Sequence, residues 1–415
     1  MDVFNLKYMR MIRFTLRSIG AWPSHEFEDV PATKLTLLSS YSYTCFLCII
    51  CCFGTIAQIA YLITNQGILG FIDLGQTYLT VLMCFVYIQR TMLPLQTSYQ
   101  AEIIEFSTKF HLMYHKNETE FAAKMHNKVK RICEIVTGIQ HLQIYYVLVM
   151  YNIAPLYSNF KSGMLSSEKP INGAYEHSVY YVLPFDHNNE VWYPVVGLYN
   201  FYVSYNLGAM FSCHDLLISV YVFHIWGHLN ICEHNLNNFP RPSITRNSKT
   251  VPLRYSAEEN KKVAAGLKEI IIHYIMIKKF VEKTSNTYSV TLCFYYGFHM
   301  VAECILLLQC STLEVEALAK YGFLTVAVYQ ELIQLSVVFE LIYAKGTSLI
   351  DAVYGLPWEC MDNSSRRTVL ILLQIVQQPL SLKACGMVPV GIQTMQAILK
   401  GSFSYFLMLR TFANQ

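Results

Sequence analysis

The sequence predicts an all-α membrane protein with seven transmembrane helices. Hydrophobic residues make up 53% of the 415 residues and charged residues 14%, whereas soluble domains carry about 25% charged residues. Apolar runs long enough to cross a bilayer core of ~30 Å recur along the chain. Lysine and arginine gather between alternate runs. This distribution predicts an inverted topology, with the N-terminus cytosolic and the C-terminus extracellular.

The apolar runs divide the chain into segments. From the N-terminus we expect a cytosolic segment at 1–37, spans one to four at 38–226 with an extracellular loop at 159–193, a cytosolic loop and helix extension at 227–285, spans five and six at 286–344, and a second cytosolic loop at 345–367. A helical pattern from 257 to 310 is too long for one crossing, so its first half should project into the cytosol. The last span is split into 368–382 and 391–412, because Gly386 and Pro389 interrupt it.

The final helix at 391–412 has one mixed face. Six residues spaced at three or four positions form that face: Gln393, Ala397, Lys400, Ser404, Met408 and Thr411. A spanning helix with such a stripe either packs against polar neighbours or lines water. The sequence leaves both interpretations open.

The positions of charged residues and glycosylation sequons support the inverted topology. Among the loop lysines and arginines, only Lys161, Lys169 and Lys320 fall in segments placed outside. The sequons at Asn117 and Asn363 both fall inside, where they would not be glycosylated.

No catalytic or metal motif is convincing. His224, His228 and Cys232 lie on one helical face, but without an obvious fourth ligand we favour a polar interface over a metal site. The first span holds Cys45, Cys48, Cys51 and Cys52, with no second ligand pair after them, so packing is the simpler interpretation. We find no Walker loop, H-E-x-x-H or G-x-S-x-G, and therefore expect neither an enzyme nor a cofactor.

Ionisable residues fall within or near the spans, where charge is costly and marks interior contacts, water or function. They are Asp73, Asp215, His299, Glu303, Glu331 and Glu340. For Asp215 and Glu340 we favour structural pairing over a role in an ion path.

Aromatic residues are frequent in spans two to five. Each is most simply explained by core packing or an interfacial belt. Together with the small residues Gly208, Ala209 and Ser212, however, they are able to line an apolar pocket with few hydrogen-bonding groups. Such a pocket would suit a small volatile apolar ligand.

The C-terminal sequence resembles a family signature. Ser404-Tyr405-Phe406, followed by Leu407-Met408-Leu409-Arg410-Thr411-Phe412, resembles the ending of insect odorant receptors and is similar to the related gustatory-receptor ending. The cytosolic loop after span four is shorter than that of the olfactory co-receptor, so the resemblance is to a ligand-binding subunit.

The resemblance implies roles for particular residues. It implies that 391–412 lines the pore and that 368–382 belongs to the assembly domain. Within the pore helix, Met408 and Phe412 would form an apolar gate, with the polar residues Ser404 and Thr411 beside it. It implies a ligand pocket in the outer half of the bundle. The candidate pocket residues are Tyr78, Leu82, Phe85, Tyr145, Val149, Tyr205, Ala209 and Ser212.

The family also implies a function. The chain would join the olfactory co-receptor in a heterotetrameric, ligand-gated, non-selective cation channel in the plasma membrane, in the dendrites of olfactory sensory neurons. Its partners would be a small volatile apolar ligand and membrane lipid, with no nucleic acid. Residues 70–94 resemble moth sequences, which implies a pheromone-type ligand. Alternatives are a gustatory receptor subunit or a G-protein-coupled chemoreceptor, although D-R-Y and N-P-x-x-Y are missing from the sequence.

Overall fold

The computed structural model describes residues 3–23, 27, 34–166, 170, 173–186, 189–243, 254–311 and 315–413. Within its helices, the side chains at 34–41, 71–73, 315–317, 319–320 and 412–413 lie outside this description. The predicted residues Asp73 and Phe412 are therefore placed only by their helices.

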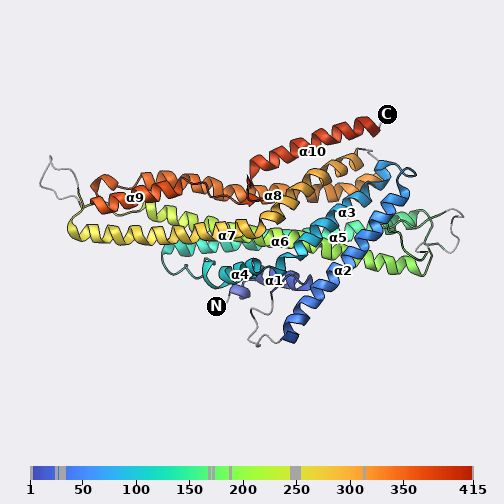
Figure 1. The fold of residues 1–415 in the computed structure, drawn as a ribbon, viewed down its shortest axis with the longest axis horizontal. Coiled ribbons are helices and arrows are strands. Elements are labelled where there is room, and N and C mark those ends of the chain that lie inside the picture. Colours follow the sequence, from blue (N-terminus) through green and yellow to red (C-terminus); the bar gives the residue numbers. More distant parts are fainter. Residues whose placement is uncertain are drawn as a thin grey trace.

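Long helices build an elongated bundle (Figure 1). They are α2 (Lys34–Asn65), α3 (Phe71–Thr91), α5 (Glu120–Lys161), α6 (Trp192–Asn237), α7 (Ala257–Cys310) and α8 (Val315–Tyr354). Within the described residues, these are the six helices long and apolar enough to cross a membrane. The helical character predicted from composition is confirmed.

The last helix, α10 (Ile392–Ala413), is not among those six. Its polar residues, such as Gln393 and Lys400, lower its hydropathy below that of the others. It lies on one side of the bundle, against α7 and α8 (Figure 1).

Short elements connect the long helices. They are η1 (Val3–Asn5), α1 (Lys7–Ser18), η3 (Leu93–Leu95), α4 (Thr97–Glu105), the π-helical turn η4 (Phe106–Phe110), η5 (Trp358–Cys360), α9 (Asn363–Val376), β1 (Lys383–Ala384) and β2 (Val388–Pro389).

Helix α6 is the centre of the fold. Its apolar residues continue around the whole circumference, and side chains such as Leu216, Ile218 and Val222 are almost fully buried. A helix that is apolar on every side is stable only when other helices surround it. Helices α5, α7 and α8 do so here.

Local signals set several helix ends. At the start of α7, the Ser256 hydroxyl accepts from the Glu259 backbone, and the Glu259 carboxylate accepts from the Ser256 backbone, which makes a capping box. Thr119 caps α5 through the Ala122 backbone at 3.0 Å. The bounds of α7 are those that the helical pattern predicts.

Two helices extend into segments that the sequence analysis assigned to cytosolic loops. Helix α6 continues to Asn237, beyond the predicted boundary at 226, because no breaker occurs before Pro240. Helix α8 continues to Tyr354, so the first part of the loop expected at 345–367 is helical. Lys345 and Ser348 both donate to Glu233 of α6, which lets polar residues remain in a packed helix.

The predicted helix at 368–382 is also displaced. Helix α9 begins at Asn363, because the Asp362 carboxylate accepts from the Ser365 backbone at 2.9 Å. It ends at Val376, shortly before Pro379, which cannot continue a helix.

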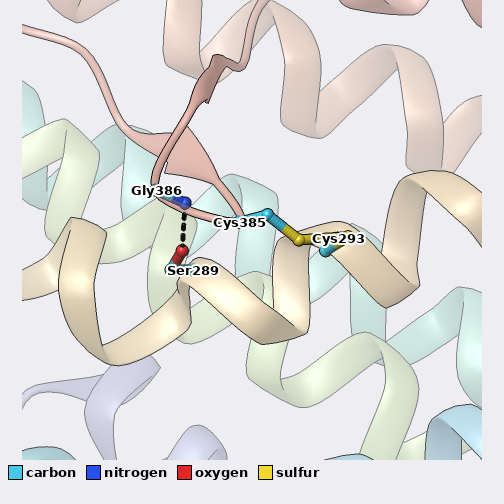
Figure 2. The surroundings of a disulfide bond; sticks show 4 residues. All are labelled: Ser289, Cys293, Cys385 and Gly386. Atoms are coloured by element: carbon cyan, nitrogen blue, oxygen red, sulfur yellow. Dashed lines mark hydrogen bonds between the residues drawn. A yellow bond between two sulfur atoms is a disulfide. The ribbon is translucent and has the colours of Figure 1, made fainter.

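A two-stranded hairpin joins α9 to α10. Strands β1 and β2 pair antiparallel, with Ala384 opposite Val388. Cys385 and Gly386 between them have φ of 50° and 69°, the left-handed region that suits a tight turn. Cys385 forms a disulfide with Cys293 of α7, and the Gly386 backbone donates to the Ser289 hydroxyl at 2.7 Å (Figure 2). The sequence predicts the break in the helix but gave no signal for this disulfide.

Candidate ligand cavity and its link to the last helix

A cavity of about 110 Å³ lies inside the bundle. Helices α2, α3, α5, α6, α7 and α8 line it, together with the segment that connects α5 to α6. Its wall is mostly apolar and includes Leu79, Ile144, Val147, Leu207 and Phe298. Such a lining with a few polar groups is typical of small-molecule sites.

Helical periodicity brings the lining side chains together. On α5, Gln143, Val147 and Tyr151 recur every four residues and share one face. On α6, Ser204, Gly208 and Ser212 do the same. The separation of eight positions from Gln143 to Tyr151 corresponds to ~12 Å along the helix axis, which gives the approximate length of the cavity.

Tyrosine hydroxyls lie at the end of the cavity near the α5–α6 connection. Tyr151 donates to the Ser178 carbonyl at 2.7 Å. Tyr181 is 3% exposed, and its hydroxyl has no hydrogen-bond partner among the described residues. A buried donor without a partner is costly, so this hydroxyl is a candidate contact for a bound molecule.

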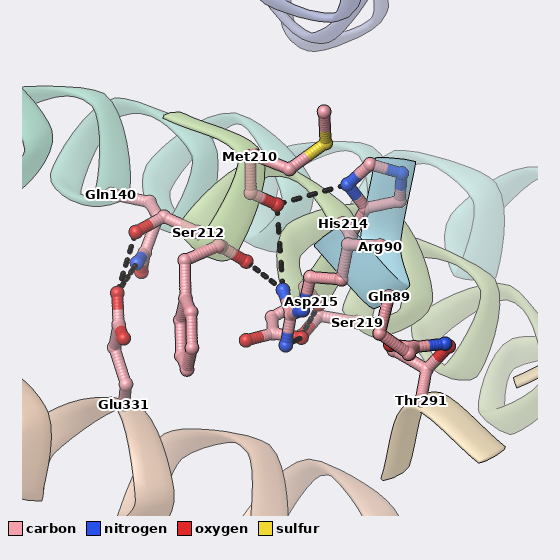
Figure 3. A network of polar contacts seen from close by, with 11 residues as sticks. Gln89, Arg90, Gln140, Met210, Ser212, His214, Asp215, Ser219, Thr291 and Glu331 are labelled. Atoms are coloured by element: carbon pink, nitrogen blue, oxygen red, sulfur yellow. Dashed lines mark hydrogen bonds and ion pairs between the residues drawn. The ribbon is translucent and has the colours of Figure 1, made fainter. Parts of the chain in front are cut away.

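Glu331 of α8 lies at the opposite end. Its Oε1 accepts from the Ser212 hydroxyl at 2.6 Å and from the Gln140 amide at 3.1 Å. Figure 3 shows these side chains converging from α5, α6 and α8. Among the described residues of the lining, Glu331 is the one acidic or basic side chain.

A buried ion pair lies beside this end (Figure 3). Arg90 of α3 is fully buried and contacts Asp215 of α6 at 2.8 Å. Its guanidinium also donates to the Phe211 carbonyl and lies 4.3 Å from the centre of the Phe211 ring. Since Phe211 lines the cavity, the ion pair supports one of its walls. The structural pairing predicted for Asp215 is thus present.

Polar side chains also join α7 to α10. His299 follows the cavity residue Phe298, and its Nδ1 lies 3.5 Å from Oε1 of the fully buried Glu303. The Ser402 hydroxyl of α10 donates to Glu303 Oε2 at 3.2 Å. The predicted ionisable residue Glu340 accepts from the Ile392 backbone at 3.3 Å and so holds the start of α10.

The possible metal ligands make other contacts. His224 Nδ1 lies 2.9 Å from the Val220 carbonyl, while the two ring nitrogens of His228 contact His273 and the Phe110 carbonyl at 2.9 and 2.7 Å. No group of three metal-ligating residues is found in the part of the chain that the structure describes. These histidines form a polar interface between helices.

The eight predicted pocket residues do not lie together. Ser212 lines the cavity. Phe85, Tyr145 and Val149 are 49%, 46% and 42% exposed on the outside of the bundle. Ala209 is fully buried beside the cavity stripe of α6.

The remaining three make contacts elsewhere. The Tyr205 hydroxyl lies 2.7 Å from the Ser18 hydroxyl. Tyr78 and Leu82 face a separate apolar groove of about 510 Å³, which they share with Met408 of α10.

The mixed face of α10 is uncovered in the single chain. Its six members, Gln393, Ala397, Lys400, Ser404, Met408 and Thr411, are all exposed, whereas Ile398, Ser402 and Phe406 face the bundle. The polar stripe is therefore not packed against polar neighbours among the described residues. Thr411 donates to the Leu407 carbonyl at 2.9 Å, and Phe412 follows it in the helix.

Sequence reasoning missed most of the cavity. Gln58, Thr80, Tyr151 and Tyr181 line it but were not among the predicted pocket residues. The sequence analysis named Glu331 as an ionisable residue of the spans, but it did not predict that this side chain faces the cavity. Tyr181 belongs to an irregular segment, where no periodicity indicates which side chains point inward.

Comparisons with known proteins identify the family. Residues 73–403 match the family model described as 7tm odorant receptor. Odorant receptor 67c of Drosophila melanogaster is 22% identical over 208 residues, which is 50% of this chain and 48% of that protein. Odorant receptor 10 of Aedes albopictus is 33% identical over 63 residues, 15% of this chain and 17% of that protein. The chain thus spans about half, or less, of the length of these curated relatives.

Solved structures share the whole fold. The insect olfactory receptor OR5 from Machilis hrabei has a TM-score of 0.74 at 14% identity, with 97% of both chains covered. The same receptor in complex with eugenol has a TM-score of 0.76 at 14% identity, with 98% of both chains covered.

The apolar helices and the family match together define a polytopic membrane receptor rather than an enzyme. The chain belongs to the insect odorant receptor family. The family predicted from the sequence is confirmed.

Proposed function

We propose that this chain is the odorant-binding subunit of a ligand-gated cation channel, in which a small volatile molecule binds the cavity around Gly208 and Ser212. The main observation in favour is the cavity itself, with its apolar wall and the unpartnered Tyr181 hydroxyl. The eugenol complex of a receptor with the same fold supports a small organic ligand.

The channel would form with the olfactory co-receptor in the plasma membrane, with the N-terminus cytosolic. The exposed stripe of α10 would face the pore, with Met408 and Phe412 as the gate and Ser404 and Thr411 beside them. An exposed polar stripe on an otherwise apolar helix favours this arrangement, because lipid would not solvate it. Apolar side chains close such a pore by excluding water. A pheromone-type ligand is the narrower version of this proposal.

The ligand would act by favouring the open state. A molecule that binds closed and open states equally shifts nothing, however tight its binding. The contacts from Phe298 and His299 through Glu303 to Ser402 connect the cavity wall with α10. Displacement of Phe298 by the ligand is therefore the step that we expect to move α10.

Filling the cavity tests this proposal. A Cβ on Gly208 would meet nothing within 4 Å, so Gly208→Leu directs a side chain into the cavity without a backbone clash. Gly197 of the same helix also has open space but is exposed, so Gly197→Leu is the matched control. Both changes favour the helix by up to about 1 kcal/mol.

The assay is inward current in oocytes that express each variant with an insect olfactory co-receptor. We expect Gly208→Leu to raise the half-maximal concentration of active odorants at least about tenfold, equivalent to ~1.4 kcal/mol. Gly197→Leu should respond as the wild type does. Equal responses of both variants, at equal surface expression, would show that the ligand binds elsewhere. A response abolished by G-protein block would exclude direct gating.

A further inference from the structure

We propose that Glu331 binds the hydroxyl group of an alcohol ligand at its end of the cavity. This inference rests on the proposed function, since it assigns the polar group of the odorant that the cavity would hold. Glu331 would select alcohols among the small molecules that fit the cavity.

One oxygen of Glu331 is already occupied and the other is not. Oε1 accepts both hydrogen bonds that the carboxyl makes, from Ser212 at 2.6 Å and Gln140 at 3.1 Å. Oε2 has no hydrogen bond to any described residue, although the side chain lines the cavity. The two neutral donors hold the carboxyl in place, which leaves Oε2 for a group inside the cavity.

The nearby cation, Arg90, forms its ion pair with Asp215 and not with Glu331. Arg90 contacts Asp215 at 2.8 Å and also donates to the carbonyl of Phe211. Within the described residues, no lysine, arginine or histidine lies within 4.0 Å of Glu331 as an ion-pair partner. A carboxyl away from bulk water needs further hydrogen bonds, and a ligand would supply one.

A hydroxyl group suits this position better than other odorant groups. It donates to an ionised carboxylate and accepts from a protonated one, so it pairs with Oε2 in both forms. Aldehydes and esters only accept, and an alkylammonium only donates. Two other polar groups of the lining are engaged within the protein: Thr80 donates to Gln58 at 2.6 Å, and Tyr151 donates to the Ser178 carbonyl at 2.7 Å.

The apolar wall would hold the rest of the alcohol. From Glu331 the lining of α8 continues through Val328 and Ala327 to Leu324, seven residues or ~10 Å along the helix. The ligand would lie along this wall, with its tail toward Tyr181. The opposite orientation would place the hydroxyl at Tyr181, at the other end of the cavity, so the two orientations depend on different side chains.

The experiment measures concentration–response curves in oocytes that express the chain with an insect olfactory co-receptor. The probes are linear primary alcohols from hexanol to dodecanol, together with the aldehyde, acetate and amine of the most active length. The variants are Glu331→Leu, Glu331→Gln, Tyr181→Phe and, as a control, Gln334→Leu, which removes a polar side chain of α8 outside the cavity lining. Surface labelling confirms equal expression.

We expect an alcohol to be the most potent probe on the wild type. Glu331→Leu should raise its half-maximal concentration about tenfold or more, since hydrogen bonds to charged groups contribute ~1.5–3 kcal/mol. The acetate should change by less than about threefold, so loss of alcohol preference is distinguished from general damage. Glu331→Gln keeps a donor and an acceptor and should retain the preference. Gln334→Leu should have no effect.

Three results would overturn the inference while leaving the proposed function intact. They are a more potent amine or ester than any alcohol, an unchanged alcohol-to-acetate ratio in Glu331→Leu, or a selective loss of alcohol potency in Tyr181→Phe. Silence toward every probe from a chain that reaches the surface would also count against the inference. Insensitivity of all responses to Gly208→Leu would instead refute the cavity as the binding site.

Discussion

The buried pair of Arg90 and Asp215 should be far more sensitive to single substitution than an exposed pair. The side chains are 0% and 9% exposed and lie 2.8 Å apart. At an effective dielectric of ~20, their attraction is ~6 kcal/mol. Desolvation offsets much of this attraction, but Asp215→Asn would leave the buried Arg90 charge without its counter-charge. We therefore expect it to lower the free energy of unfolding by about 3–5 kcal/mol.

A double substitution distinguishes the effect of an unpaired buried charge from the effect of altered packing. Arg90 Nε and Asp215 Oδ2 have no hydrogen bonds among the described residues, so the pair is not fully satisfied. Replacing both partners, by Arg90→Met with Asp215→Leu, removes the charges together and should restore most of the lost stability. The exposed pair of Lys261 and Glu258 is the control, because Lys261→Ala should cost less than about 1 kcal/mol.

The assay is thermal unfolding of purified protein in detergent, followed by tryptophan fluorescence and by size exclusion. The expected order of stability is wild type, Lys261→Ala, the double variant and Asp215→Asn. A double variant as unstable as Asp215→Asn would mean that packing, and not the unpaired charge, is responsible. An Asp215→Asn variant no less stable than Lys261→Ala would refute the reasoning altogether.

Three further predictions use the same assay. Burial raises the pKa of Glu102 to about 7, above its ordinary value of ~4.3. Between these two pH values the folded state keeps a proton that the unfolded state releases, so the free energy of unfolding should fall by about 3 kcal/mol as the pH rises. Glu102→Gln should remove this pH dependence. Cys385→Ser opens the disulfide to Cys293, whose sequence separation is 92 residues, and should cost about 2–4 kcal/mol, unlike Cys45→Ser at an exposed free thiol. Ser402→Ala removes the donor to buried Glu303 and should cost about 1–3 kcal/mol, whereas the exposed Ser404→Ala on the same helix should be neutral within about 0.5 kcal/mol.

The fold was more predictable than the cavity because the two depend on different information. Helix existence follows from local apolar periodicity, and the start of α7 follows from the Ser256–Glu259 capping box. The extent of α8 did not follow, because Lys345 and Ser348 suggest a loop until Glu233 of α6 is known to bind them. That contact joins residues more than 100 positions apart, which no local pattern reveals.

The candidate site was harder to predict because it depends on helix rotation. Tyr145 was selected on α5, but Gln143 and Val147 face the cavity. A shift of two residues turns a side chain by ~200°, from the inside of the bundle to the outside. On α6, the predicted residue Ser212 lines the cavity, on a side of the helix where small residues leave space.

In the channel proposed above, a chain of contacts would connect the ligand cavity with the pore. Phe211 and Phe298 form one wall of the cavity, with ring centres 5.0 Å apart. Behind them lie Arg90, stacked on Phe211, and His299, which leads through Glu303 to α10. A close-packed interior transmits a displacement instead of absorbing it. A ligand that binds the open arrangement of these rings about 100-fold more tightly would supply ~2.8 kcal/mol toward opening. That free energy would move α10 through its contact with α7. Substitutions at this contact should therefore alter the open probability at saturating odorant more than the half-maximal odorant concentration.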